Sequence, residues 1–75
     1  MEPEQFRALE SALAANHAQM ADQLGISEIS VKRYATGTQP IPGHIAKLSL
    51  ALMLIVNEGL QKKFDRALAK YHNDT

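Results

Sequence analysis

The side chains that could do chemistry in this chain are three histidines and a short cluster of charged residues near its middle. His17, His44 and His72 lie far apart, without the spacing of metal ligands, and no nucleophile stands beside an acid or base in a recognisable arrangement. The chain has no cysteine, which rules out a disulfide framework and a cysteine-based metal site. Lys32 and Arg33, by contrast, offer several N–H donors close together. These residues favour binding over catalysis, and we expect no enzyme activity, no metal and no cofactor.

The charged cluster must be positioned by a helix that follows a sharp corner. Before the corner, Met20, Ala21 and Leu24 form one apolar stripe of a short helix that starts near His17, and Ala21 is small enough for a second helix to cross close above it. Gly25 then follows, and glycine readily adopts the left-handed conformation in which helices often end. The pattern therefore predicts a helix that ends at Gly25.

The second helix of the corner is predicted over residues 28–36. Ser27 is a good N-cap for it, and Gly37 ends it as Gly25 ends the first. Val31 and Tyr34, three positions apart, would face inward. The charged residues of this helix would then project outward.

The stretch from His17 to Gly37 resembles the helix-turn-helix of the phage repressor and Cro-like (XRE) family. Ala21, Gly25, Val31 and Tyr34 stand at its four structural positions, and His17 stands where the family commonly has glutamine. The following T-G-T-Q-P-I-P-G-H-I-A-K-L looks like the next loop and helix of the family, so that the resemblance covers about residues 6–54. It implies a lambda repressor-like fold that binds DNA.

The resemblance places the base-reading residues on the outward face of the second helix, at Glu28, Ile29, Lys32 and Arg33. The guanidinium of Arg33 can donate to both acceptors of a guanine, a contact worth about 1–3 kcal/mol of discrimination. Glu28 can accept a hydrogen bond from a cytosine amino group, and Ile29 can contact a thymine methyl group. Arg33 is the strongest candidate, although a solvated helix face is the simpler alternative.

The DNA backbone is expected to be met by polar residues around this helix. Short polar side chains beside exposed backbone N–H groups bind phosphates and set register without reading sequence. The candidates are His17, Gln19, Ser27, Ser30, Thr36, Thr38, Gln39 and Lys47. For His17 and the loop residues, plain exposure to solvent explains the pattern equally well.

Apolar spacing predicts three further helices. The first covers residues 3–15 and starts with Pro3, which suits a first helical turn. The second begins near residue 42 or 43, runs to 57 and contains seven consecutive apolar residues, 50–56; the last covers 58–71. The tail, 72–75, is expected to fray. The chain is thus predicted to be one all-α domain over residues 1–75, compact and built of five helices.

The apolar residues of the last two helices exceed what one small domain can bury. A 75-residue chain has a limited core, and a helix that is apolar on most sides must be covered on most sides. The last helix can fold back onto the preceding helix and complete the core of the monomer, or it can pack with that helix across a two-fold axis. We expect it to contribute to both the monomer core and a dimer interface. The segment 43–71 is predicted to supply a homodimer interface formed by Leu50, Met53, Leu54, Leu60, Phe64 and Leu68.

The formal net charge of +0 argues mildly against nucleic-acid binding, but the charges are unevenly distributed. Residues 1–28 hold five acids and one base, whereas residues 29–50 hold three bases and no acid. The positive region coincides with the segment that would meet DNA. No apolar run approaches the roughly 18 residues of a membrane span, and no signal peptide is recognisable, so we expect a cytoplasmic protein.

The predicted function is that of a sequence-specific transcriptional regulator of double-stranded DNA. We expect a homodimeric repressor that occupies an inverted-repeat operator and binds no small-molecule ligand. Short phage Cro-like regulators and anti-CRISPR-associated regulators are both similar to this chain, and the sequence does not choose between them. An antitoxin of the same fold, or a helical protein-binding module that uses the 50–56 ridge without DNA, remain alternatives.

Overall fold

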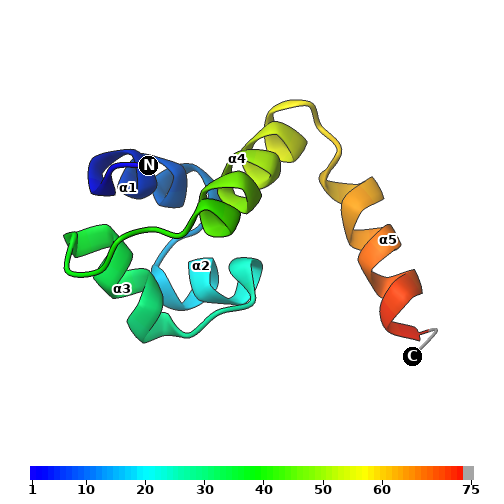
Figure 1. Cartoon of the computed structure of the whole chain (residues 1–75). Helices are drawn as coiled ribbons and strands as arrows, with labels where there is room; N and C mark the ends of the chain where they lie inside the picture. Colours follow the sequence, from blue (N-terminus) through cyan, green and yellow to red (C-terminus); the bar gives the residue numbers. More distant parts are fainter. Residues whose placement is uncertain (74–75) are drawn as a thin grey trace.

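The computed structural model describes residues 1–73, and this part of the chain contains five helices and no strand (Figure 1). The all-α, five-helix prediction is confirmed. The helices are α1 (Pro3–Leu13), α2 (His17–Leu24), α3 (Glu28–Thr36), α4 (Gly43–Asn57) and α5 (Gln61–Asn73). None of the described helices is long and apolar enough to cross a membrane.

The corner between α2 and α3 is fixed by backbone hydrogen bonds and by a side-chain cap. Gly25 has φ 69°, and its N–H donates to the carbonyl of Asp22, while the N–H of Ile26 donates to the carbonyl of Ala21 at 3.1 Å. This pair of bonds is the Schellman motif, which satisfies carbonyls at a helix end. Ser27 then accepts the backbone N–H of Ser30 at 3.1 Å, as an N-cap does. The predicted glycine end and serine cap are both present.

The core lies where α1, α2, α3 and α4 meet. Phe6, Met20 and Val31 are fully buried, and the Phe6 ring meets the Tyr34 ring edge to face with centroids 5.7 Å apart. Ser49 of α4 is also fully buried, which the sequence pattern does not indicate; its hydroxyl donates to a carbonyl one turn earlier in α4. The remaining buried apolar residues are Leu9, Ala21, Leu24, Ala35, Ile45 and Leu52.

Three helix boundaries differ from the prediction. The first helix ends at Leu13 rather than at residue 15, because Asn16 caps α2 and the chain before that cap is extended. The last helix begins at Gln61 rather than at residue 58, because Gly59, with φ 70°, ends α4. It also continues through residue 73, so residues 72 and 73 are helical rather than frayed, and residues 74–75 lie outside the described part of the chain.

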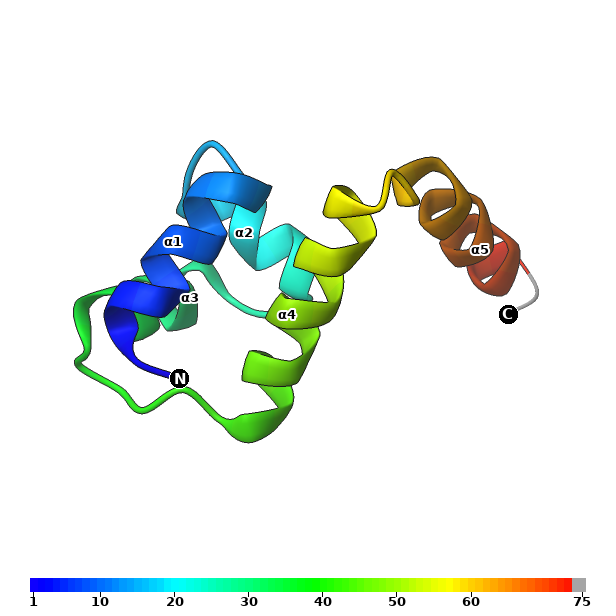
Figure 2. The same cartoon turned by 90° about the horizontal axis from the view of Figure 1, so that it is seen from above.

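α5 leads away from the body formed by the other four helices (Figure 2). The radius of gyration is 12.7 Å, against about 11 Å expected for a chain of this length. α5 meets the rest of the chain chiefly along α4, and its Phe64 packs partly against the core. The first alternative for this helix, completion of the monomer core, therefore holds for Phe64 but not for the rest of its apolar stripe.

Candidate nucleic-acid interface

The outward face of α3 brings together the four residues predicted to read bases. All four are exposed: Glu28, Ile29, Lys32 and Arg33. Glu28 is the first residue of α3, and the other three follow it by one, four and five positions, which places them on the same side of the helix. Ile29 is 62% exposed, a high value for a large apolar side chain. The face thus presents an acceptor, a methyl-bearing side chain and two cations within two helical turns.

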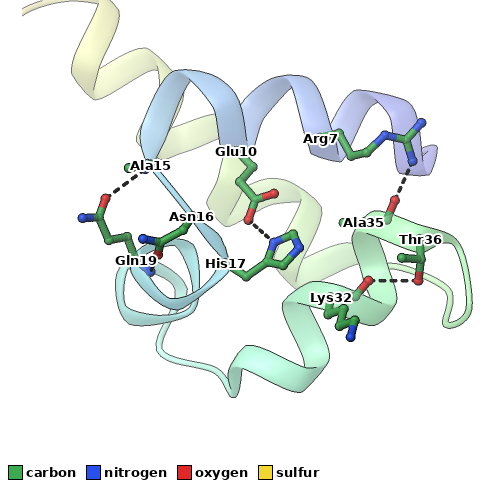
Figure 3. A network of polar contacts seen from close by, with 9 residues as sticks. All are labelled: Arg7, Glu10, Ala15, Asn16, His17, Gln19, Lys32, Ala35 and Thr36. Atoms are coloured by element: carbon green, nitrogen blue, oxygen red, sulfur yellow. Dashed lines mark hydrogen bonds and ion pairs between the residues drawn. The ribbon is translucent and has the colours of Figure 1, made fainter.

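α3 is held firmly beneath this face. Val31, Tyr34 and Ala35 point into the core, and the N-terminal end is capped by Ser27. From α1, the guanidinium of Arg7 donates to the carbonyl of Ala35 at 2.5 Å (Figure 3). This bond satisfies a carbonyl near the end of α3 and ties that end to α1. The outward residues are therefore presented by a helix whose position is fixed at both ends.

At the start of α2, two side chains predicted to contact phosphates already have partners. The Nδ1 atom of His17 lies 2.6 Å from a carboxylate oxygen of Glu10 in α1, and the Glu10 side chain is largely buried (Figure 3). The amide oxygen of Gln19 accepts the backbone N–H of Ala15 at 2.9 Å. Only the outer edge of the His17 ring and the amide nitrogen of Gln19 are left for an external ligand.

The serines at the start of α3 are similarly engaged with each other. The Ser27 hydroxyl accepts the backbone N–H of Ser30 and donates to the Ser30 hydroxyl at 2.9 Å. Ser27 is exposed and Ser30 half-buried. Each hydroxyl oxygen keeps acceptor capacity, and the Ser30 hydroxyl proton remains able to donate to a phosphate.

The loop after α3 is folded back on the end of that helix. The Thr36 hydroxyl donates to the carbonyl of Lys32 at 2.9 Å (Figure 3). It also lies 2.9 Å from the Thr38 hydroxyl, and the backbone N–H of Gln39 donates to the carbonyl of Arg33 at 3.3 Å. The Thr36 hydroxyl proton is thus engaged, so the Thr38 hydroxyl is the donor in the contact between the two threonines, and both side chains are exposed. The loop and α3 form one continuous polar edge.

Lys47 stands apart from this edge. It is exposed on α4, which packs against α1 and α2 rather than against α3. The structure therefore groups the other predicted backbone residues around the two ends of α3 and the start of α2, and leaves Lys47 outside that group.

The cations of the α3 face are not neutralised by neighbouring carboxylates. In the part of the chain that the structure describes, the one ion pair is that of His17 with Glu10. The side-chain donors of Lys32 and Arg33 are therefore available to a polyanion.

The six residues predicted for a dimer interface fall on separate surfaces. Leu50 and Met53 line a groove between α1 and α4, and Phe64 and Leu68 line a cleft beside Leu52. Leu54 is 61% exposed on the outer side of α4, and Leu60 is exposed at the turn into α5. One continuous interface through all six is not present in the single chain.

Sequence reasoning missed two side chains that support this region. Arg7 bonds to a residue 28 positions away, and Glu10 bonds to a residue seven positions away on another helix. Both residues lie on α1 and were assigned no role, since a helical period reports only which face is apolar. The excess of polar side chains on α1 opposite its buried stripe was the one available signal.

Comparison with known proteins gives no relative for this arrangement: no protein-family model matches the chain, and neither a curated protein sequence nor a solved structure is significantly similar to it.

Proposed function

We propose that the chain is a sequence-specific DNA-binding transcriptional regulator in which α2 and α3 act as a helix-turn-helix. The observation that carries the proposal is the outward face of α3 on its firmly seated helix. Lys32 and Arg33 have no ion-pair partner there among residues 1–73, and Glu28 and Ile29 are exposed beside them. The major groove of B-DNA admits one α-helix, and base edges there present distinct sets of donors, acceptors and methyl groups.

Each residue of the α3 face has a chemical role in this proposal. The Arg33 guanidinium donates to the O6 and N7 atoms of a guanine, and the Glu28 carboxylate accepts from the N4 amino group of a cytosine. Ile29 packs on a thymine methyl group, a contact for which the isoleucine must be exposed, as it is. Lys32 contacts a base or the adjacent phosphate.

The polar edge around α3 would hold the phosphate backbone. The Ser30 hydroxyl and the amide nitrogen of Gln19 have donors still available, and the Thr38 hydroxyl would reach a phosphate by releasing its bond to Thr36. These contacts set the register of α3 in the groove. His17 contributes a donor to phosphate only when its outer ring nitrogen carries a proton, because Glu10 engages the inner one.

The regulator would act as a homodimer on an inverted repeat. One copy offers few cations, so it would bind weakly and read few bases. Two copies related by a two-fold axis double the number of phosphate contacts and the number of bases read. The exposed apolar residues Leu50 and Leu54 support self-association. Repression would follow from occupancy of a promoter.

The proposal is tested by binding to the DNA upstream of the protein's own gene at several salt concentrations. The wild type, Arg33→Ala and the matched control Arg66→Ala, which removes the same exposed group from α5, are compared. We expect sequence-specific binding with a steep salt dependence that Arg66→Ala retains and Arg33→Ala loses at unchanged helicity. Equal binding by the two variants would overturn the assignment of α3.

A helical protein-binding module is the second candidate, and the exposed ridge of α4 favours it. Leu54 and Val56 both leave large apolar surface uncovered. A chain that bound neither its upstream DNA nor other duplexes at low salt, yet self-associated or captured a protein through α4, would support this second function instead.

A further inference from the structure

An apolar groove with a volume of about 410 Å³ lies uncovered between α1 and α4. The two helices run beside each other in both views (Figures 1 and 2). Its lining is Met1, Gln5, Ala8, Leu9, Ala46, Leu50 and Met53. Ala8 and Ala46 keep it open, because their methyl groups leave space that larger side chains would fill. A groove of this kind accepts the apolar face of a helix.

The far half of α5 carries a second uncovered apolar surface. Phe64 is the residue that packs on the core, whereas Leu68 is exposed and Tyr71 is 72% exposed. The cleft beneath α5 is also lined by two acids, Asp22 and Asp65, and neither has a cation within ion-pair distance among the described residues. Asp65 accepts a hydrogen bond from the side-chain amide of Gln61 within α5 at 3.0 Å, so no ion pair among the described residues ties this part of α5 to the rest of the chain.

The turn before α5 keeps this helix away from the groove of its own chain. The N–H of Gly59 donates to the carbonyl of Val56 at 3.1 Å, and the N–H of Leu60 donates to the carbonyl of Ile55 at 2.8 Å. This Schellman motif fixes the direction in which the chain leaves α4. α5 leaves on the side of Leu52, whereas Leu50 and Met53 line the groove on the other side of α4. With α5 held in this direction, a helix that fills the groove comes from another molecule.

Charge selects α5 of a second copy as that helix. α5 carries four bases and one acid, and the segment from residue 2 to 13 carries one base and three acids, of which Glu2 and Glu4 are exposed and Glu10 is engaged by His17. Packing of two α5 helices against each other would bring the basic surfaces together, whereas packing of α5 on α1 opposes opposite charges. Lys70 directly precedes Tyr71, and Glu4 lies one helical turn before Ala8, which lines the groove.

We propose that the far half of α5, anchored by Leu68 and Tyr71, docks into the α1–α4 groove of a second copy of this chain. The contact is reciprocal, so two copies form a closed dimer. Tyr71 fills the space between Ala8 and Ala46, and Gln5 in the lining is the partner for its hydroxyl. The inference specifies the homodimer of the proposed function, and it is tested without DNA.

Cysteine pairing tests the geometry, because the natural chain has no cysteine. Ala8→Cys and Tyr71→Cys chains are purified separately, mixed and oxidised. We expect a disulfide between the two kinds of chain in the mixture and little in either variant alone. A disulfide dimer of Tyr71→Cys alone would show pairing of two α5 helices, and a disulfide within the Ala8→Cys/Tyr71→Cys double variant as a monomer would show docking in its own chain. Either result overturns the proposal.

Sedimentation at micromolar concentration tests the energetics. Tyr71→Ala is expected to raise the dimer Kd about 30-fold, the size typical of a truncated interface anchor. Ala8→Glu blocks the groove and is expected to dissociate the dimer, whereas Ala18→Glu, the same change at an exposed position of α2, leaves it intact. A monomeric wild type, or a dimer that Ala8→Glu and Tyr71→Ala leave unchanged, contradicts the docking mode, whatever the outcome of DNA binding.

Discussion

Replacement of Gly25 by alanine tests the corner that positions α3. Gly25 has φ 69°, and a Cβ built there meets no atom within 4 Å, so the cost of Gly25→Ala arises from the backbone conformation and not from a clash. The left-handed conformation costs a residue with a Cβ roughly 1–2 kcal/mol. For a domain of this size, each kcal/mol lowers the melting temperature by about 4–8 °C.

Gly43 provides the matched control. It also has open space around a built Cβ, but it lies in the first turn of α4 without a positive φ. Gly43→Ala is expected to stabilise the fold by about 0.4–1 kcal/mol, since alanine restricts the unfolded chain more than glycine does. Thermal and urea unfolding followed by circular dichroism measure both variants. Equal changes in stability at the two positions would refute the claim that the left-handed turn at Gly25 shapes the corner.

Three further substitutions probe the cap, the core and the α3 face. Ser27→Ala removes the N-cap of α3 and is expected to cost about 1 kcal/mol in urea unfolding, against less than about 0.5 kcal/mol for Ser11→Ala on the exposed side of α1. Phe6→Ala removes a fully buried ring that packs on Tyr34 and is expected to lower the free energy of unfolding by about 3–5 kcal/mol, enough to unfold much of the population. A melting curve like that of the wild type would contradict the placement of Phe6 in the core. Ile29→Ala is expected to change stability by less than about 0.5 kcal/mol yet to weaken operator binding in a competition assay, and unchanged affinity would exclude Ile29 from the interface.

Local features of the fold were predictable from sequence, because each depends on a few adjacent residues. Gly25 and Gly37 end helices, Ser27 and Asn16 cap them, and the apolar spacing of Val31 and Tyr34 identifies the buried side of α3. The exposure of the opposite side follows from the same period.

Features that depend on contacts between helices were not predictable. The bond from Glu10 to His17 and the bond from Arg7 to Ala35 join residues on different helices, so no local period reports them. The separation of the apolar residues of α4 and α5 into distinct surfaces depends on the direction of the chain after Gly59. One-dimensional patterns give the faces of each helix but not the angle between two helices.

The measurement that tests sequence-specific recognition by α3 most directly is selection of bound duplexes from a random pool. We expect the wild type to enrich an inverted repeat whose half-sites lie about one helical turn, or 10 base pairs, apart. Arg33→Ala should lose the preference for guanine at one symmetric position of both half-sites and keep the rest of the motif. A pool that remains random after several rounds, or a motif that Arg33→Ala leaves unchanged, would contradict the account.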